Sequence, residues 1–450
     1  MSDLIERALL TATDTRTVIA GPDAIAAVAE SFRATFGDRP ALVVGDERTM
    51  SVAGDAVMEA LASGGVRVVD PYVFPGEPEL YAKYENCELL RDALRDVDAV
   101  PVAVGAGTLN DVVKRAAGEL ERPYLVVATA ASMDGYTAFG SSIAVGGYKQ
   151  TLDCPAPAGC VADWTVLAAA PAVMTASGYG DLLGKVPAGA DWMIADAVGV
   201  EPLDDNVWQL VQGPLRASLS RPEAVAAGEL AAIGELAEGL VMSGLAMQAH
   251  ASSRPASGAE HQFAHLWEME GHGTDVTPRR LSHGFKVAVG SVAMAALYER
   301  LLLRDLARLD VDAAVAAYPD AAALEARVRA VHQPHVVDEI VAQALAKHLT
   351  PEQLRQRLEL VASLWGGLRS RLQAQLIPAA ELQRMLRAAG TPAHPYDIGL
   401  GWQQFRDTYR RAQMIRKRYT ALDLLLETDL LDELVDELFA PGGFWAAQRG

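Results

Sequence analysis

Cysteine is scarce in this chain. The 450 residues include only three cysteines, Cys87, Cys154 and Cys160. This small, odd number argues against a disulfide scaffold, and the spacing of Cys154 and Cys160 does not fit a zinc knuckle. We therefore expect reduced and partly buried thiols.

Positive charge and long apolar runs are also in short supply. The 39 lysines and arginines are outnumbered by 58 acidic residues, which gives a net charge of −19 and a pI of about 4.9. Such a surface repels nucleic acid and anionic lipid, so neither is an expected partner. No apolar run of membrane-spanning length and no signal-peptide pattern stand out, which predicts a cytoplasmic protein without membrane insertion. An anionic substrate would need a local basic pocket.

Short apolar runs rich in valine alternate with helical stretches in the first third of the chain. Each run is bounded by Pro, Gly or Asp, as buried strands tend to be. The expected strands are TVIA (17–20), ALVVGD (41–46), VRVVDPYVF (66–74), AVPVAVGAG (99–107) and PYLVVATA (123–130). This alternation predicts a parallel sheet covered by helices on both faces. Residues 141–165 are expected to form a hairpin followed by a loop.

The character of the sequence changes after about residue 167. The following segments are rich in Ala and Leu with helical periodicity, as in residues 222–250 and 283–306. The length suggests two or three domains. We expect an α/β domain over residues 1–167 and an all-helical domain over residues 168–450. Residues 268–282 are expected to form a loop between two helices.

A glycine-bearing loop follows one expected strand. In VAVGAGTLNDVV, Gly105 and Gly107 would let the backbone approach a pyrophosphate at the start of a helix. The motif lacks the usual third glycine, and an ordinary strand-to-helix turn is the alternative. The candidate acid for the ribose, Asp46, precedes Gly105 by 59 residues (105 − 46), whereas it normally follows. This reversed order resembles the superfamily of iron-containing alcohol dehydrogenases, glycerol dehydrogenases and dehydroquinate synthases.

Three further stretches make the resemblance specific. TAASMDGYTAFGSS (129–142), SGYGDLLGKVPAGADW (177–192) and SRPASGAEHQFAHLWEM (253–269) with the following LSHGFKVAVG (281–290) resemble segments of the sn-glycerol-1-phosphate dehydrogenases, in the same order. The likeness is greatest to the bacterial type and covers roughly residues 43–289. It implies a dehydroquinate-synthase-like architecture, with an N-terminal dinucleotide-binding α/β domain and an all-helical C-terminal domain that binds metal and substrate.

The resemblance also implies site residues. Asp46 and two short segments would bind the cofactor; the segments are Gly105, Ala106, Gly107, Thr108 and Leu109, and Thr129, Ala130, Ala131 and Ser132. Asp181, His261 and His283 would bind one divalent metal ion. Asp134, Asp181 and His265 would contact the substrate, with Asp134 and His265 as catalytic residues. Ala106 stands where relatives commonly have Gly, and His272 is an alternative to His283 as ligand.

The residue types suit this chemistry. Two imidazoles and one carboxylate leave open positions on a metal ion; zinc fits this set, and nickel and iron(II) also accept it. His265, one helical turn from His261, could relay a proton. Asp46 could accept both ribose hydroxyls, which favours NAD, while Arg48 could offset the repulsion of a 2′-phosphate and allow NADP.

Each residue also has a purely structural interpretation. Asp181 could cap a helix, His261 and His265 could lie on a half-buried helix, and Asp134 could be a turn aspartate. His283 could simply begin a helix. Lys185 and Asp191 are expected to be solvated or packing residues.

The expected activity is the interconversion of dihydroxyacetone phosphate and sn-glycerol 1-phosphate by hydride transfer. The substrate would be a triose or polyol phosphate, and a homodimer or larger homo-oligomer is expected. The alternatives are a related polyol or polyol-phosphate dehydrogenase, a dehydroquinate-synthase-like lyase, and a non-catalytic binding protein on the same fold.

Overall fold

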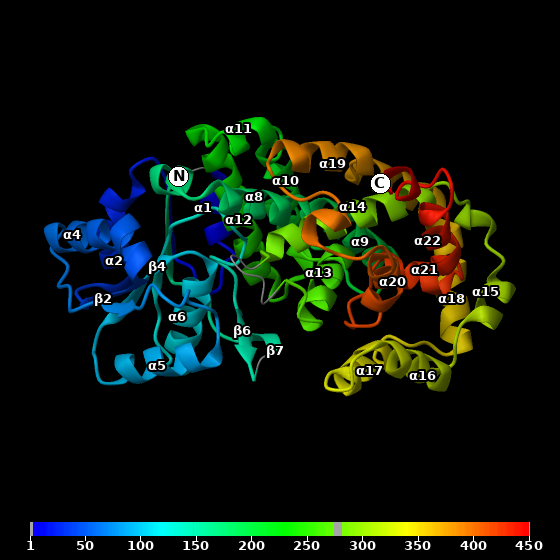
Figure 1. Cartoon of the computed structure of the whole chain (residues 1–450), viewed down its shortest axis with the longest axis horizontal. Coiled ribbons are helices and arrows are strands. Elements are labelled where there is room, and N and C mark those ends of the chain that lie inside the picture. Colours follow the sequence, from blue (N-terminus) through cyan, green and yellow to red (C-terminus); the bar gives the residue numbers. More distant parts are fainter. Residues whose placement is uncertain (1–2, 147, 274–280, 450) are drawn as a thin grey trace. The chain divides into compact units, whose positions relative to one another are not determined.

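A six-stranded parallel sheet organises the first part of the chain (Figure 1). The computed structural model describes residues 3–146, 148–273 and 281–449. The strand order is β1-β8-β5-β4-β2-β3, and a separate antiparallel hairpin pairs β6 with β7. The strands are β1 (Thr17–Gly21), β2 (Ala41–Asp46), β3 (Tyr72–Phe74), β4 (Val100–Gly105), β5 (Leu125–Ala128), β6 (Ser141–Val145), β7 (Tyr148–Leu152) and β8 (Gly159–Asp163).

Both faces of this valine-rich sheet are buried under helices. On one face, Val43, Val102 and Val127 pack with Phe32 of α2 (Val28–Phe36) and Leu61 of α4 (Asp55–Ser63). Side chains alternate along each strand, so the intervening residues point to the other face. There α6 (Gly107–Glu119) packs against β4, and α5 (Tyr84–Arg95) packs against α6 (Figure 1). The expected parallel sheet with helices on both faces is confirmed.

Two details of the sheet differ from the sequence prediction. The expected hairpin is present, but the segment after it contains β8, which lies inside the parallel sheet between β1 and β5. Its five buried residues, GCVAD, form too short and too weakly apolar a run to stand out. The run expected over residues 66–74 forms a strand only at β3. Val68 makes an isolated bridge to Ala41, and the intervening Pro71 has no N–H to donate.

The helices fall into two compact units. The first comprises residues 1–182, 206–256 and 388–390, and the second comprises residues 183–205, 257–387 and 391–450. The remaining helices assigned to the first unit are α1 (Asp3–Leu9), α3 (Glu47–Thr49), α7 (Trp164–Ala169), α8 (Ala172–Leu183), α10 (Asp205–Ser218), α11 (Pro222–Ala226) and α12 (Leu230–His250). Residue 167 thus lies near the change from strands to helices, while the compact units divide elsewhere because α8 and α10–α12 pack with the sheet unit.

The second unit contains helices and connecting loops, and its described residues form no strand. It contains the segment that carries all three site histidines of the sequence prediction. Its helices are α9 (Lys185–Ala197), α13 (Ala259–Met269), α14 (His283–Leu301), α15 (Val311–Ala317), α16 (Ala321–Val331), α17 (Val337–Leu345), α18 (Pro351–Gln375), α19 (Ala379–Ala388), α20 (Trp402–Ala412), α21 (Ala421–Glu427) and α22 (Leu431–Phe439).

One helix has the length and hydropathy of a membrane span, contrary to the sequence expectation. Helix α12 has 21 residues, and 78% of its most apolar window is buried inside the protein. Its apolar surface is therefore used in the core of the first unit. The three cysteines are likewise buried and free, and burial raises the pKa of the Cys87 and Cys160 thiols to about 12.

Glycine at position 178 allows α8 to pass very close to the chain after β5. A Cβ atom at Gly178 would lie 2.0 Å from the carbonyl oxygen of Ala131. We expect Gly178→Ala to lower the free energy of unfolding by about 1–3 kcal/mol, because backbone must move. Thermal unfolding measures the change.

Gly366→Ala is the control, because Gly366 lies in α18 with no atom within 4 Å of the added Cβ. This substitution should stabilise the protein slightly. Equal effects of the two substitutions would contradict the packing argument.

Candidate functional site

The predicted cofactor residues gather at the carboxyl ends of three neighbouring strands. Strand β4 lies between β2 and β5, and Gly105 at its end pairs with Ala128 at the end of β5. The N–H of Thr129 donates to the carbonyl oxygen of Gly105 at 3.2 Å. Asp46 ends β2 on the other side of β4. This edge is where open α/β sheets bind ligands.

The turn from β4 to α6 is crowded at its two glycines. A Cβ atom at Gly105 would lie 2.5 Å from Cδ2 of Leu109, and one at Gly107 would lie 3.1 Å from the Met133 side chain. Ala106 is the N-cap of α6 and makes no side-chain hydrogen bond to the first turn. The first-turn N–H groups have no intrahelical partners and carry the positive end of the helix dipole. Ala106 therefore leaves this end of the helix open to an anion.

Asp46 has a structural task in addition to its predicted one. Its Oδ1 accepts hydrogen bonds from the N–H groups of Arg48 and Thr49, at 2.9 and 2.8 Å, and so caps α3. The nearby Arg48 pairs with Glu77. The carboxylate is thus oriented by the backbone, which leaves Oδ2 for the proposed ribose contact.

The segment after β5 is tied down at several points. Its residues Ala130 and Ser132 accept hydrogen bonds at their carbonyl oxygens from the Tyr136 hydroxyl at 2.6 Å and the Ser177 hydroxyl at 3.1 Å. Ala130 and Ala131 are buried. The predicted nicotinamide-lining segment therefore has a fixed course beside the glycine turn.

Lys114 is an important residue that the sequence analysis did not identify. It lies on α6 with 1% of its surface exposed, and burial lowers the pKa of its ammonium. Its Nζ donates to the carbonyl oxygens of Gly135, Ala138 and Gly140 at 3.0, 2.6 and 3.0 Å. One buried lysine thus holds the loop that carries Asp134. A lysine on a helix gives no sequence signal of burial.

Asp134 and Asp181 are held near each other in the first unit. The N–H of Asp134 donates to Asp181 Oδ2 at 3.1 Å, and Asp134 Oδ2 accepts from the Ser243 hydroxyl of α12 at 2.9 Å. Asp181 is fully buried and lies in the last turn of α8. The helix N-cap alternative for Asp181 is therefore wrong, whereas Asp134 lies at a bend directly before the turn at Gly135 and Tyr136.

Three imidazoles gather in the second unit. His261 and His265 lie one turn apart on α13, and His283 is the first residue of α14, the helix that packs against α13. The ring centroids are 6.2 Å apart for His261 and His265, and 5.4 Å apart for each of the two pairs with His283. Ser282 caps α14 by accepting from the N–H of Phe285. His283 therefore both begins a helix and joins the cluster.

Carboxylates hold the Nδ1 atom of each ring. His261 Nδ1 lies 2.7 Å from Glu260 Oε1, His265 Nδ1 lies 3.3 Å from Glu268 Oε2, and His283 Nδ1 lies 2.9 Å from Glu268 Oε1. An ionised carboxylate only accepts, so each Nδ1 carries the hydrogen. In a neutral ring Nε2 then carries a lone pair and no hydrogen, as a metal ligand or a proton acceptor requires. Glu260 and Glu268 were not identified from the sequence, although Glu268 follows His265 by three residues.

The environment keeps His265 neutral. Loss of solvation lowers the pKa of His265, Glu268 opposes this, and Arg416 and His283 lower the pKa as well, so that together they bring it to about 3. His272, the alternative ligand, contacts the carbonyl oxygen of Ile398 through Nε2 at 2.6 Å. A carbonyl only accepts, so this nitrogen carries its hydrogen and offers no lone pair.

The start of α13 is fixed by a buried carboxylate. Asp191 of α9 accepts from the N–H of Ala259 at 2.6 Å and from the Tyr298 hydroxyl at 2.5 Å. A Cβ atom at Gly258 would lie 2.5 Å from Asp191 Oδ2, so the approach requires glycine. Asp191 and Lys185 are both fully buried, so of the two expected alternatives, solvated or packing residues, their burial agrees with the second. Burial and the nearby Glu260 raise the pKa of Asp191 to about 6.

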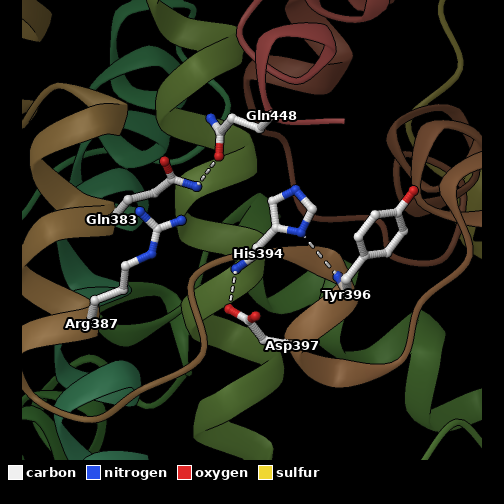
Figure 2. A pocket seen from close by; sticks show the side chains of 6 residues that line it. All are labelled: Gln383, Arg387, His394, Tyr396, Asp397 and Gln448. Atoms are coloured by element: carbon white, nitrogen blue, oxygen red, sulfur yellow. Dashed lines mark hydrogen bonds between the residues drawn. The ribbon is translucent and has the colours of Figure 1, made fainter. Parts of the chain in front are cut away.

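A separate pocket of about 420 Å³ in the second unit contains none of the predicted site residues (Figure 2). Most of the polar groups drawn in it pair with one another: Gln383 donates to Gln448, and the N–H of His394 donates to Asp397. The residues that line it are Gln383, Arg387, His394, Tyr396, Asp397 and Gln448. We assign no role to this pocket.

The histidine donors fit a divalent transition metal. Neutral imidazoles with a carboxylate on the second nitrogen are the common form of histidine ligands to zinc and its neighbours. His261 is buried and His283 is half-buried, with 28% of its side chain exposed. The described residues thus offer two oriented nitrogen ligands.

Comparison with known proteins agrees with this architecture. A family model described as iron-containing alcohol dehydrogenase matches residues 19–171. A probable glycerol dehydrogenase from Sinorhizobium meliloti superposes with a TM-score of 0.59 at 16% identity, covering 94% of this chain and 97% of that one. A sulfoacetaldehyde reductase from Bifidobacterium kashiwanohense, solved in complex with NAD+, gives a TM-score of 0.58 at 14% identity, covering 94% and 98%. At these identities the likeness establishes the fold.

Curated relatives narrow the family. A glycerol-1-phosphate dehydrogenase (NAD(P)+) from Geobacillus thermodenitrificans is 35% identical over 58% of this chain, and the match spans 64% of that protein. The enzyme of the same name from Geobacillus stearothermophilus is 31% identical over 75% of this chain and 84% of its own length. Identity at this level, over most of a relative's length, establishes kinship. The chain therefore belongs to the glycerol-1-phosphate dehydrogenase family, within the iron-containing alcohol dehydrogenase superfamily.

Proposed function

We propose that this protein interconverts dihydroxyacetone phosphate and sn-glycerol 1-phosphate, using NAD(P) and one divalent metal ion. The observation that carries the proposal is the cluster of three carboxylate-oriented imidazoles in a chain whose relatives are glycerol-1-phosphate dehydrogenases. The glycine turn at the carboxyl edge of the sheet supports the cofactor part of the proposal.

The nucleotide would bind at this edge. We propose that the first-turn N–H groups of α6 bind the pyrophosphate and that the segment Thr129–Ser132 lines the nicotinamide, which supplies or accepts the hydride. Asp46 Oδ2 would accept the ribose hydroxyls and favour NAD. Arg48 is paired with Glu77, which leaves it less able to neutralise a 2′-phosphate.

Asp181, His261 and His283 are the proposed metal ligands. The metal, with zinc our first choice and nickel or iron as alternatives, would supply a Lewis acid that lowers the pKa of the substrate hydroxyl. The chain's own contribution is orientation: Glu260 and Glu268 hold the rings through Nδ1, and Asp181 receives the N–H of Asp134. The loop that carries Asp134 is in turn held by Lys114.

His265 is the proposed proton acceptor and donor. Because its Nδ1–H is directed at Glu268, the ring would present Nε2 to the substrate, take the hydroxyl proton there during oxidation and return it during reduction. Asp134 is proposed to contact the substrate. Lys286, whose Nζ lies 3.7 Å from Glu268 Oε1, and Arg416 bring positive charge to the neighbourhood of His265 despite the net charge of −19.

We expect a preference for dihydroxyacetone phosphate over free dihydroxyacetone. One charge-assisted hydrogen bond to the phosphate should be worth about 1.5–3 kcal/mol, or roughly a 10–100-fold difference in kcat/KM. The measurement is NADH oxidation with each ketone over a range of concentrations. Arg416→Ala should narrow the difference if this arginine attracts the phosphate. A wild-type preference for the free ketone would show that the substrate proposal is wrong and would favour a simple polyol dehydrogenase.

Three further properties remain predictions. They are a cytoplasmic location, a homo-oligomeric assembly and the identity of the metal. Metal analysis of the purified protein and its mass in solution address the last two directly.

A further inference from the structure

Glu268 has an unusual position among the site residues. It lies in the last turn of α13, three residues after His265 and seven after His261, so helical periodicity places it on the histidine face. One oxygen contacts His265 Nδ1 at 3.3 Å, and the other contacts His283 Nδ1 on α14 at 2.9 Å. A single carboxylate thus joins the two helices through two imidazoles.

The carboxylate is buried enough for these contacts to matter. Only 7% of the Glu268 side chain is exposed, and a charge so placed requires donors. The carboxylate contacts the two ring nitrogens and also Lys286 Nζ, which lies 3.7 Å from Oε1. An ionised carboxylate only accepts, so each ring presents its Nδ1–H to Glu268, and a ring in its neutral form then has no hydrogen on Nε2.

We propose that Glu268 is a positioning residue that sets the tautomer and orientation of His265 and His283 together. This inference rests on the proposed function, in which His283 Nε2 ligates the metal and His265 Nε2 accepts the substrate proton. One carboxylate then prepares both the Lewis-acid site and the proton-transfer group. His261 has its own carboxylate, Glu260, and is independent of Glu268.

A second arrangement uses the same atoms differently. One ligand atom from each of His265, Glu268 and His283 lies within 4.8 Å of the others, so Glu268 could itself be a metal ligand. Removal of a ligand should abolish binding, whereas removal of a residue that only orients ligands typically weakens metal binding or activity by about 10–100-fold. The size of the loss therefore separates the two roles.

The test is Glu268→Gln. Glutamine keeps the volume, but its amide nitrogen cannot accept from an Nδ1–H, so one of the two rings must move its hydrogen to Nε2. Glu270→Gln is the matched control, because Glu270 directly follows the same helix and contacts Arg411 and Gln404. Both variants are measured with Zn²⁺ against a chromogenic chelator, in turnover at saturating Zn²⁺, and by ¹⁵N NMR of the histidine rings in the metal-free protein.

We expect Glu268→Gln to bind Zn²⁺ about 10–100-fold more weakly, to have a lower kcat at full occupancy, and to show one ring changed from Nδ1–H to Nε2–H. Glu270→Gln should match the wild type in all three. Unchanged tautomers and Zn²⁺ affinity in Glu268→Gln would overturn the proposal, as would complete loss of Zn²⁺ binding, which would make Glu268 a ligand. Failure of the substrate proposal would instead appear only in the ketone assay, since the NMR and Zn²⁺ measurements need no substrate.

Discussion

His261→Ala is expected to lose the bound metal, and with it nearly all activity. The ring is 8% exposed at its side chain and oriented by Glu260, so its loss removes a preorganised ligand. Removal of a residue that only orients ligands lowers metal affinity by about 10–100-fold, and removal of a ligand should lower it more. Metal analysis of the purified variant beside the wild type measures the effect.

Thermal unfolding provides an independent readout for this variant. A metal ion that binds only the folded state, at a free concentration 100 times its Kd, stabilises that state by about 2.7 kcal/mol. Added Zn²⁺ should therefore raise the Tm of the wild type and not that of His261→Ala. His272→Ala is the control, because His272 contacts the Ile398 carbonyl and is not expected to ligate. Metal loss in His272→Ala, with retention in His283→Ala, would reverse the ligand assignment.

His265→Ala is expected to fail in a different way. It should keep its metal and still bind NADH, since we assign neither task to this imidazole. Its kcat should fall by about 10²–10⁴-fold, the usual contribution of a positioned proton-transfer group. Steady-state kinetics beside metal analysis separates it from His261→Ala, and added imidazole should restore part of the rate.

Two outcomes would contradict this role for His265. Wild-type turnover in His265→Ala would show that the ring is a packing residue and that the proton travels by another route. Loss of metal in the same variant would instead favour the arrangement in which His265, Glu268 and His283 together hold the ion.

The sheet could be predicted from sequence because its strands are short valine-rich runs that alternate with amphipathic helices. β8 was missed because its five residues, GCVAD, are buried by their neighbours and not by their own hydrophobicity. The division into compact units could not be predicted either. The division depends on the elements against which α10 and α12 pack. The hydrophobic periodicity of a helix shows which of its faces is apolar, but it does not show which element packs on that face.

Helical spacing paired only His261 with His265, and His283 was added by the resemblance to the glycerol-1-phosphate dehydrogenases; the fold brings the three rings together. The residues that orient them were not predicted. Lys114 and Glu268 look like ordinary surface charges in the sequence. Only the fold places Lys114 against three carbonyl oxygens and Glu268 between two imidazoles. The carbonyl groups that Lys114 contacts lie 21 to 26 residues further along the chain, and Glu268 contacts His283 on a second helix.

The most direct test of the account is the oxidation of the two glycerol phosphate enantiomers by the metal-loaded enzyme. We predict NAD⁺ reduction with sn-glycerol 1-phosphate and, because a fixed metal and proton acceptor admit one hand of the substrate, a rate at least about 100-fold lower with sn-glycerol 3-phosphate. Chelation of the metal should abolish the faster reaction. Equal rates with both enantiomers, or full activity after the metal has been removed, would contradict the account.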